Sequence, residues 1–563
     1  MINLEVVWMK GICMKKKIYI LLLILLSIII SYLSLQSAVY ISYAIDGILF
    51  NHAEKIPSYL EQVLEMSTIE GLVIISSIII IMNLLIVFVN YIRERVTTNF
   101  MLKISSNLKK KLYAHILKLE YESYQSYSKV EMLQRVNEDA TAYADFFKTQ
   151  FNLILDIVSL GFFIVSKGVF LSSFITMYLM LTIALMLAFA LWYFLKMTDR
   201  LKKVINKKKK MLGKMIENMN HFKFVRIYNR QKEEIQKYKR LNREYTQEDV
   251  KFVDLILFYE IVSEHMTYVK DPIIYLLGGI AIMRGSMTLG TLATFILLAS
   301  KILGCLYTFG ENLEVLDTFL VVKQKIKKLM NLKEEENGNN YYDLDGDIVF
   351  NHVSINISQR EILSDLNFEI KKGEKIAILG ENGSGKSVLA KAILGFYPLQ
   401  GAIYLNHHNN QQLNPSNIRQ YIDFVSGEAD LFTGTILENI QLNKEATEQQ
   451  LIKVVKEAKI YQDIKRFEEG CQTLVGEKGV KLSGGQKQRI IMARALLRNK
   501  PIMIFDNSFS KLDNKTSDKV FHNLIKKYPQ TTMIFITHKA EIENYVDRVI
   551  KISGIKSNNE EEE

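Results

Sequence analysis

The chain has 563 residues, of which 49% are hydrophobic and 23% are charged, and it carries a formal net charge of +11. This apolar content, without a collagen or heptad period, excludes disordered, collagen-like and coiled-coil classes. Three scattered cysteines with no CxxC pair argue against a disulfide framework or a zinc site, and the length predicts several domains of about 100–200 residues each.

Six apolar runs in the first 306 residues are the first feature along the chain. Several of them reach or exceed the roughly 20 residues that cross a bilayer. The first run follows three lysines, as in a secretory signal peptide, but it is too long and no small-residue cleavage site follows, which favours an uncleaved span. The runs are Ile18–Tyr40, Gly71–Tyr91, Phe151–Phe170, Leu171–Leu195, Ile273–Met283 and Leu289–Leu306.

Charged residues are distributed unevenly between these runs. Residues 46–70 hold five acids and one lysine, whereas residues 93–135 hold nine basic residues and four acids, and residues 196–210 hold eight basic residues and one acid. The positive-inside rule places the first segment outside the cell and the other two in the cytoplasm. Six spans with both chain ends inside satisfy this pattern. The net positive charge is therefore an orientation signal, and no basic face on a soluble domain predicts nucleic-acid binding.

Long polar stretches follow the second and the fourth run. They contain almost no glycine or proline, the residues that interrupt helices most strongly. We expect the spans to continue through these stretches as helices that reach well into the cytosol.

Four charged residues fall in or near the spans: Asp156, Lys270, Asp271 and Lys301. A charge at mid-bilayer costs about 2.5–3.5 kcal/mol on insertion scales, so such residues usually face a cavity or a partner. The competing interpretation is that they lie near helix ends or pair locally. Lys301 is the best candidate for a cavity, because apolar residues flank it on both sides.

The composition changes at residues 333–340, where acids, asparagine and glycine cluster as in a linker. Beyond Asp347, predicted strands and helices alternate, as in a parallel α/β domain. Apolar strands are predicted at Lys375–Leu379, Ile502–Phe505 and Thr532–Ile536.

The strand that ends at Leu379 runs directly into the sequence GENGSGKS, which matches the phosphate-binding loop G-x-x-x-x-G-K-[ST]. Its glycines let successive backbone N–H groups point inward and hold an anion, and the following helix aims its positive end at the phosphates. Lys386 is expected to reach the β- and γ-phosphates, and the Ser387 hydroxyl to bind Mg²⁺. The candidate nucleotide-binding residues of this loop are Gly380, Glu381, Asn382, Gly383, Ser384, Gly385, Lys386 and Ser387.

Two further motifs accompany the phosphate-binding loop. Asp506 ends an apolar strand, and P-loop proteins hold Mg²⁺ with such a carboxylate at the end of a neighbouring strand. The sequence LSGGQ lies between the loop and this strand. Its residues Ser483, Gly484, Gly485 and Gln486 can offer N–H and hydroxyl donors to a phosphate at a helix start.

With these motifs the chain resembles the ATP-binding-cassette (ABC) transporters, specifically their exporter half-transporters, over nearly its whole length. The resemblance rests on GENGSGKS, LSGGQ, IMIFD, SKLD and DLFTGTILENI, and on the loop sequences LYAHILKLEYESYQ and ENMNHFKFVRIYNRQKEE. It implies an all-α six-helix transmembrane domain followed by an α/β P-loop NTPase domain, with ATP and Mg²⁺ as cofactors. It also implies that two cassettes pair head to tail, with each ATP between the P-loop of one chain and the LSGGQ of the other. In that arrangement Asp513 lies at the cassette interface and His538 contacts the γ-phosphate.

The resemblance also gives the expected domain boundaries. The family places its coupling helices, which transmit cassette closure to the spans, in the long cytoplasmic loops. The expected parts are a cytoplasmic N-terminal segment at residues 1–17, the transmembrane domain at 18–325, a linker at 326–346, the cassette at 347–556 and an acidic tail at 557–563.

Three positions depart from the family pattern. Asn507 stands where the family has a glutamate as general base. Because an amide cannot accept the proton of the attacking water, hydrolysis here should be slower by about 10²–10⁴-fold. Gly427 replaces the glutamine that helps to sense Mg²⁺ and the γ-phosphate. Ile357 aligns near the aromatic residue that stacks on adenine, and Tyr341 or Tyr342 could take its place only if the linker folds back.

The intact LSGGQ means that this chain would hold ATP at its own site and complete the site of a partner. The pattern predicts a heterodimer with a sister half-transporter that carries the glutamate, in an ATP-driven exporter of the plasma membrane. The alternatives are a homodimer with low ATPase activity and some other base, and an ATP-responsive regulator or channel subunit. The spans argue against a soluble cassette protein, and the fused cassette argues against an importer. The substrate class stays open among peptides, lipids and amphipathic compounds.

Overall fold

The computed structural model describes residues 13–50, 67–335, 341–357, 360–381, 383–428, 431–476 and 482–552. Residues 1–12 of the expected N-terminal segment, Asn382 of the phosphate-binding loop and the expected tail 557–563 lie outside the described residues. The chain divides into two compact units. Unit 1 comprises Met1–His115 and Lys129–Asn331, and unit 2 comprises Ile116–Ser128 and Leu332–Glu563.

Unit 1 is helical wherever its residues form a regular element that the structure describes. Its described helices include six segments that are long and apolar enough to cross a membrane, which confirms the six predicted spans by length and composition. In chain order the helices are α2 (Cys13–Tyr43), the π-helix η1 (Ala44–Leu49), α4 (Thr68–Ile116), α6 (Lys129–Gln134), the π-helix η4 (Arg135–Asp139), α7 (Ala140–Lys148), α8 (Gln150–Leu171), α9 (Ser173–Asn220), α10 (Phe222–Ile227), α11 (Gln231–Met283), α12 (Leu289–Glu311) and α13 (Leu313–Met330).

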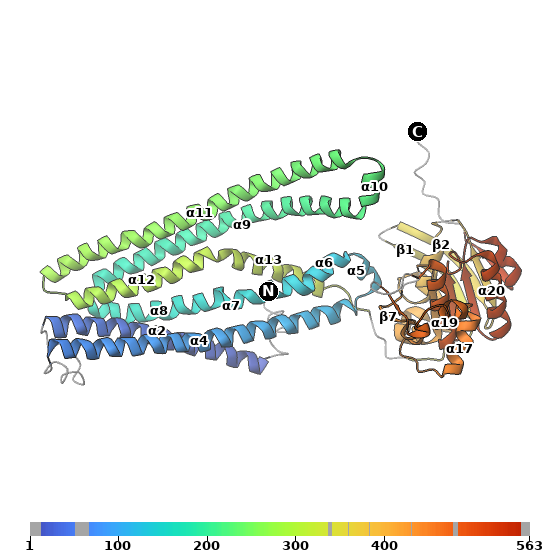
Figure 1. The fold of residues 1–563 in the computed structure, drawn as a ribbon, viewed down its shortest axis with the longest axis horizontal. Coiled ribbons are helices and arrows are strands. Elements are labelled where there is room, and N and C mark those ends of the chain that lie inside the picture. The colour runs from blue at the N-terminus through green and yellow to red at the C-terminus, as the bar shows by residue number, and fades with distance from the viewer. Residues whose placement is uncertain are drawn as a thin grey trace. The chain divides into compact units, whose positions relative to one another are not determined.

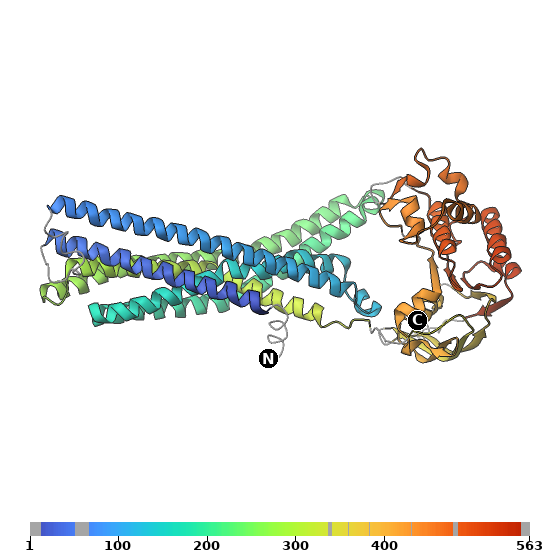
Figure 2. The ribbon, with the colours of Figure 1, turned by 90° about the horizontal axis from the view of Figure 1, so that it is seen from below.

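Three of these helices are much longer than a bilayer is thick. The helices α4, α9 and α11 have 49, 48 and 53 residues, and at about 1.5 Å per residue each is more than twice as long as a hydrocarbon core of about 30 Å. Figure 2 shows the long helices running along one direction. The prediction that apolar runs continue as helices through the polar stretches is confirmed.

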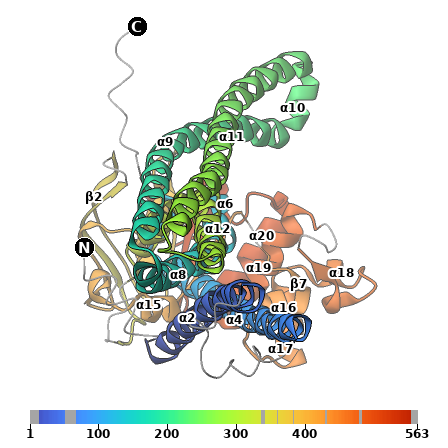
Figure 3. The same cartoon turned by 90° about the vertical axis from the view of Figure 1, so that its left-hand side faces the viewer.

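The helices of unit 1 pack around an apolar core at one end of the bundle. Buried side chains of α2, α8, α9 and α12 form this cluster, which includes Leu35, Ile164, Leu179 and Phe295. The helices α9 and α11 form a hairpin closed by the short helix α10 (Figure 1). Seen along the bundle, this hairpin rises on one side while α2 and α4 lie on the other (Figure 3).

Unit 2 combines strands and helices, as the sequence predicts. Its elements are α5 (Tyr121–Gln125), β1 (Ile348–Ile357), β2 (Arg360–Ile370), β3 (Lys375–Leu379), α14 (Lys386–Ile393), β4 (Gln400–Leu405), β5 (His408–Asn409), the 3-10 helix η5 (Asn410–Gln412), α15 (Pro415–Tyr421), β6 (Ile422–Ser426), β7 (Gly434–Thr435), α16 (Ile436–Gln441), α17 (Glu448–Glu457), α18 (Tyr461–Ile464), the 3-10 helix η6 (Gly470–Gln472), β8 (Leu474–Val475), α19 (Gly484–Arg498), β9 (Ile502–Asp506), α20 (Asn514–Lys527), β10 (Thr532–Ile536), the 3-10 helix η7 (Ala540–Tyr545) and β11 (Arg548–Lys551).

The central sheet of unit 2 is parallel, with the strand order β11-β3-β10-β9-β6. Every residue of β3, β9 and β10 is buried, because helices or a second sheet cover both faces of a parallel sheet. Alternate residues enter two different clusters. Ile376, Ile504 and Ile534 pack with α14 and β1, whereas Ala377, Met503 and Met533 pack with α19 and α20.

A second, antiparallel sheet has the order β2-β1-β4-β5, and β7 pairs with β8. The topology corrects one prediction. The strand that ends at Asp506 is not a neighbour of the phosphate-binding-loop strand, because β10 lies between β3 and β9. Asp506 and the loop must therefore meet through side chains that extend beyond the sheet edge.

Candidate nucleotide-binding site

The phosphate-binding loop leaves the sheet after β3 and ends at the first turn of α14. Gly385 has φ +87°, a conformation that L side chains rarely adopt. A β-carbon there would lie 2.9 Å from side-chain atoms of both Ile362 and Leu363. The glycine is thus required both by the backbone and by the close packing of β2 against the loop.

Lys386 is the first residue of α14 and turns back over the loop. Its Nζ donates to the carbonyl oxygens of Gly380 at 2.7 Å and Glu381 at 2.5 Å, and to the Ser384 hydroxyl at 3.1 Å. Burial lowers the pKa of Lys386, and the carboxylate of Asp506 opposes this shift. An ammonium group held by loop oxygens fits a phosphate, whose oxygens can replace them as acceptors.

Ser387 and Asp506 meet at the edge of the sheet. The Ser387 hydroxyl donates to Asp506 Oδ1 at 2.9 Å. Asp506 is only 8% exposed, and burial raises its pKa, partly offset by the hydrogen bond from Ser387 and by the charges of Lys391 and Lys386. A hydroxyl and a carboxylate oxygen are the ligands that Mg²⁺ prefers. These two residues would therefore hold the magnesium ion of a bound nucleotide, and the start of α14, not a neighbouring strand, brings them together.

Asn507 follows β9 in a left-handed backbone conformation, with φ +50°. Its N–H donates to the Ile536 carbonyl at 2.8 Å, and its own carbonyl accepts from the Ser510 hydroxyl at 2.8 Å. Among the residues that the structure describes, its buried Oδ1 has no hydrogen-bond partner. The side chain presents an amide, and not a carboxylate, beside the predicted metal ligand Asp506.

Gly427, the second departure, touches the first. It follows β6, and a β-carbon on it would lie 2.8 Å from the Asn507 carbonyl oxygen and 3.1 Å from Asn507 Cβ. Any other residue at 427 would therefore displace the backbone of Asn507. The two departures form one packed contact and are not independent losses.

Gln488 was not singled out by sequence, although it joins three parts of the site. Its side chain is fully buried, its Oε1 accepts from the Lys511 N–H at 3.2 Å, and its Nε2 lies 3.3 Å from the Gly427 carbonyl and 3.4 Å from the Ser510 hydroxyl. It lies in α19, two residues after LSGGQ. The only signal in the sequence was a polar residue on the apolar face of a helix.

The LSGGQ residues form the start of α19. Ser483 caps the helix: its hydroxyl accepts from the Gln486 N–H at 3.2 Å, and its own N–H donates to Gln486 Oε1 at 2.9 Å. A β-carbon on Gly484 or Gly485 would lie 2.7 Å or 3.0 Å from atoms of Lys511. Within the described part of the chain, no hydrogen bond or ion pair joins residues 483–486 to the phosphate-binding loop.

Three other predicted residues make no polar contact with the loop in the described part of the chain. Asp513 caps α20, and hydrogen bonds from the side chain of Thr516 and from its N–H, 2.9 Å away, hold the pKa of Asp513 below the ordinary value. His538 is exposed and lies two residues beyond β10. Ile357 is the last residue of β1, opposite Arg360. In the described segments none of these three makes a hydrogen bond or ion pair with the loop.

The two tyrosines considered as a replacement for Ile357 have other contacts. Tyr342 stacks on His408, with ring centroids 4.1 Å apart. The Tyr341 hydroxyl accepts from the Asn414 side chain at 3.2 Å. Both contacts hold these rings against the segment from β5 to α15, so they are engaged in unit 2 away from the loop.

The helix α5 belongs to unit 2 and packs at the other end of α14. The Tyr121 ring lies 5.0 Å from that of Phe396 and 5.5 Å, edge on, from that of Tyr397. Lys391 donates to the Tyr121 hydroxyl at 3.3 Å. The helix α14, which begins at Lys386, thus contacts α5 near its other end. In the sequence, α5 lies between the second and third spans.

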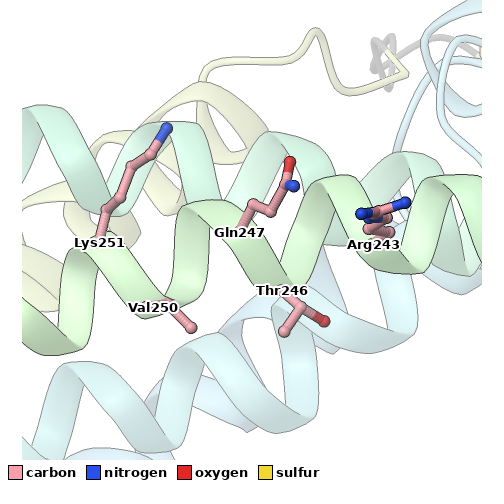
Figure 4. A pocket seen from close by; sticks show the side chains of 5 residues that line it. All are labelled: Arg243, Thr246, Gln247, Val250 and Lys251. Atoms are coloured by element: carbon pink, nitrogen blue, oxygen red, sulfur yellow. The ribbon is translucent and has the colours of Figure 1, made fainter.

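A shallow hollow of about 540 Å³ lies along α11 (Figure 4). All of its lining side chains come from this one helix: Arg243, Thr246, Gln247, Val250 and Lys251. It contains no carboxylate, nucleophile or metal-binding set, and we assign no chemistry to it.

Comparison with known proteins agrees with this arrangement. The sequence profile of the ABC transporter transmembrane region matches residues 20–306, and the ABC transporter profile matches residues 363–510. The ABC transporter ATP-binding protein YfiB of Bacillus subtilis is 30% identical over 454 residues, which cover 79% of this chain and 78% of YfiB. The transport/processing ATP-binding protein ComA of Streptococcus pneumoniae is 37% identical over 286 residues, covering 49% of this chain and 39% of ComA.

A solved structure shares the whole fold. A bacterial Atm1-family ABC exporter with ATP bound superimposes with a TM-score of 0.79 over 93% of this chain and 92% of that chain, at 19% identity. The spans and the cassette therefore form the fold of an ABC exporter. The chain belongs to the ABC transporter family, as a multi-pass half-transporter with its transmembrane region and ATP-binding domain fused in one polypeptide.

Proposed function

We propose that this chain is one subunit of an ATP-driven exporter that moves a peptide, a lipid or an amphipathic compound out across the plasma membrane. The six spans, the fused cassette and the charge asymmetry of the loops support this function, and the charge asymmetry also supports a cytoplasmic location for the cassette and both chain ends. The names of ComA and of the B. subtilis relative YheI, a multidrug resistance ABC transporter, assign transport to those proteins. The substrate of this chain is a narrower question, taken up below.

The observation that carries the finer proposal is Asn507. An amide oxygen beside Asp506 can accept a hydrogen bond from water but cannot take up its proton, so the site can bind ATP and Mg²⁺ and hydrolyses ATP slowly. The residues expected to hold the phosphates and the metal ion are in position, because Lys386 lies over the loop and the Ser387 hydroxyl donates to Asp506. We therefore assign nucleotide holding, and not turnover, to this chain's own site.

The intact LSGGQ supports a heterodimer. Ser483 and the glycines after it form the capped start of α19. In the described part of the chain, their N–H and hydroxyl donors make no hydrogen bond with the phosphate-binding loop. In the head-to-tail pairing of the family, they complete the site of the other chain. A sister half-transporter with glutamate at the position of Asn507 would then hydrolyse ATP at that second site.

The test is ATP turnover of the purified full-length chain, alone and after assembly with a sister half-transporter that has this glutamate. We expect the lone chain to turn over at least about 10²-fold more slowly than the pair. Robust turnover by the lone chain that Lys386→Ala abolishes would contradict the proposal.

The competing homodimer needs another base, and Glu428 is the residue to examine. It is exposed, follows Gly427, and its negative charge acts on Asp506. If Glu428→Gln removes turnover of the lone chain, the homodimer replaces the heterodimer. An ATP-responsive regulator or channel subunit would instead bind ATP without driving substrate uptake into inside-out vesicles.

A further inference from the structure

Lys301 lies at the middle of α12, the sixth apolar span. Twelve residues of this helix precede it and ten follow it. At about 1.5 Å per residue the ends of the helix are roughly 15–18 Å away. A lysine can bring its ammonium group to the membrane surface only from near a helix end, so this charge must find its partner within the membrane.

The other span charges noted in the sequence have partners inside the chain. Asp156 forms an ion pair with Arg93, which also donates to the Ser27 hydroxyl at 3.2 Å. Lys270 is 2% exposed and its Nζ lies 2.7 Å from Asp271 Oδ1. For these residues local pairing is the correct interpretation.

Lys301 differs from them, because it makes no ion pair with any residue that the structure describes. Its side chain is exposed on the surface of α12.

The face of α12 that carries Lys301 is polar and open. Leu297, Ser300 and Lys301 are exposed, and a β-carbon on Gly304 would meet no atom within 4 Å. Their spacing of three or four residues places them on one side of the helix. The opposite side, which includes Leu298, Ala299, Ile302 and Leu303, is buried in the core of unit 1.

A face turned toward lipid has a different composition, as α4 illustrates. Most of the exposed residues in the middle of its apolar run are large and apolar, and the one exposed polar residue between them, Asn83, donates its side-chain amide to the Ile79 carbonyl. The apolar ones are Ile80, Ile81, Leu84, Leu85, Val87 and Phe88. The α12 face instead combines a hydroxyl, a charge and a glycine. We conclude that it lines a water-accessible path through the spans and not the lipid boundary.

The charge of Lys301 is not balanced by a carboxylate among the described residues. Cys305, one turn further along α12, is the titratable group that acts on it electrostatically. Asp156 also acts on Cys305, but its ion pair is with Arg93. An unbalanced cation attracts an anion.

We propose that Lys301 is the anchor for an anionic group of the transported compound, a carboxylate or a phosphate, an inference that rests on the proposed exporter function. The Lys301 ammonium binds the anion, and the apolar remainder of an amphipathic substrate contacts the span residues around it. The exporter therefore takes anionic amphiphiles in preference to neutral ones of the same shape.

The test uses the full-length chain in phosphatidylcholine nanodiscs, with dansyl-undecanoic acid as the probe and its neutral carboxamide as the matched ligand. We expect the carboxylate to bind about tenfold more tightly than the carboxamide. Lys301→Gln should remove this preference and Lys301→Arg should keep it. Lys167→Gln, which removes an exposed charge near the end of α8, should leave the preference unchanged. A dansyl alkyl phosphate in the same assay separates phosphate from carboxylate recognition.

Equal binding of the carboxylate and the carboxamide, or an unchanged preference in Lys301→Gln, would overturn the inference, provided that ATP still raises the unfolding temperature of the variant as in the parent chain. Loss of the preference on assembly with the sister chain, together with weaker assembly of Lys301→Gln, would also overturn it, because Lys301 would then pair with the sister chain.

ATP-driven uptake of the probe into vesicles separates the two proposals. Uptake without charge preference would support the exporter function and contradict the anion site at Lys301. Charge-selective binding without uptake would support the anion site and contradict the exporter function.

Discussion

Asp506 shows how a binding residue can oppose the stability of the empty protein. Burial raises its pKa, so its charged form is less favourable in the folded chain than in the unfolded chain. The sign of the pH effect follows: as the pH rises through the raised pKa, the folded state loses stability relative to the unfolded state.

We therefore predict that Asp506→Asn stabilises the nucleotide-free chain. The gain should be about 0.5–2 kcal/mol, which is common when a functional site is optimised for stability. The same change should remove the extra stabilisation that Mg²⁺ gives in the presence of ATP, because an amide is a weaker ligand for this ion. Thermal unfolding at several pH values, with and without Mg²⁺-ATP, measures both effects.

Glu541→Gln serves as the control, since it changes an exposed carboxylate of the same unit to an amide. It should leave both the unfolding temperature and the Mg²⁺ effect unchanged. If Asp506→Asn lowered the stability of the empty chain, the Ser387 hydrogen bond would outweigh the cost of burial, and the sign argued here would be wrong.

At the level of single residues, the sequence predicts those parts of the site that are contiguous in the chain. The phosphate-binding loop and the aspartate after an apolar strand are of this kind, because their spacing is dictated by the geometry of a bound phosphate and its metal ion. The contact between Gly427 and Asn507, 80 positions apart, joins two strand ends and leaves no trace in local sequence. The hydrogen bonds of Gln488 were invisible for the same reason.

Among the elements, the three central strands β3, β10 and β9 are predicted closely from sequence, because they are buried on both faces and form short continuous apolar runs. The outer strands β6 and β11 of the same sheet are not predicted. Most strands of the antiparallel sheet were missed. The strands β1 and β2 alternate buried and exposed residues only in part, because their pairing contains register shifts. Their sequences therefore show neither the two-residue period of a strand nor the 3.6-residue period of a helix clearly. The order β3-β10-β9 depends on long-range pairing, which a pattern of apolar residues does not encode.

The aromatic contacts of the short helix α5 in unit 2 come from Tyr121. Each aromatic contact of the kind that Tyr121 makes with Phe396 and Tyr397 contributes about 0.5–1.5 kcal/mol beyond its buried area, and five residues alone do not form a stable helix. We predict that Tyr121→Ala releases α5 from unit 2, seen as faster amide hydrogen exchange over residues 121–125. Nucleotide binding should persist, because Lys386 and Ser387 lie at the other end of α14.

Two further variants make this prediction specific. Tyr121→Phe keeps the ring contacts and loses only the hydroxyl that accepts from Lys391, so exchange should stay close to that of the parent chain. Tyr124→Ala changes another tyrosine of the same helix and is the matched control. Equal exchange in Tyr121→Ala and the parent chain would mean that other contacts, such as the backbone hydrogen bond from Glu120 to Lys333, hold the helix.

At the scale of the whole molecule, the two functional surfaces of the cassette are unequal. Lys386 and Ser387 of the phosphate-binding loop are in position to hold a nucleotide, and we propose that Asn507 leaves this site without its base. The start of α19 is intact and lies apart from that loop. In a pair with a sister chain, the loss of ATP turnover caused by a substitution should therefore depend on which of the two nucleotide sites the substituted residue belongs to.

Ser483 allows this asymmetry to be tested without disturbing the fold. Asparagine and aspartate cap helices as well as serine does, so Ser483→Asn and Ser483→Asp should both preserve α19. Only the aspartate places a negative charge against the phosphate of the sister chain's nucleotide. We predict that Ser483→Asp lowers ATP turnover of the assembled pair by about 10²–10³-fold, as loss of a transition-state donor does, with a smaller loss for Ser483→Asn.

Lys386→Ala, which disables this chain's own weakly hydrolysing site, should lower the ATP turnover of the pair much less. If turnover instead fell more in Lys386→Ala than in Ser483→Asp, hydrolysis would occur at this chain's own loop, and the heterodimer with one active site would have to be abandoned.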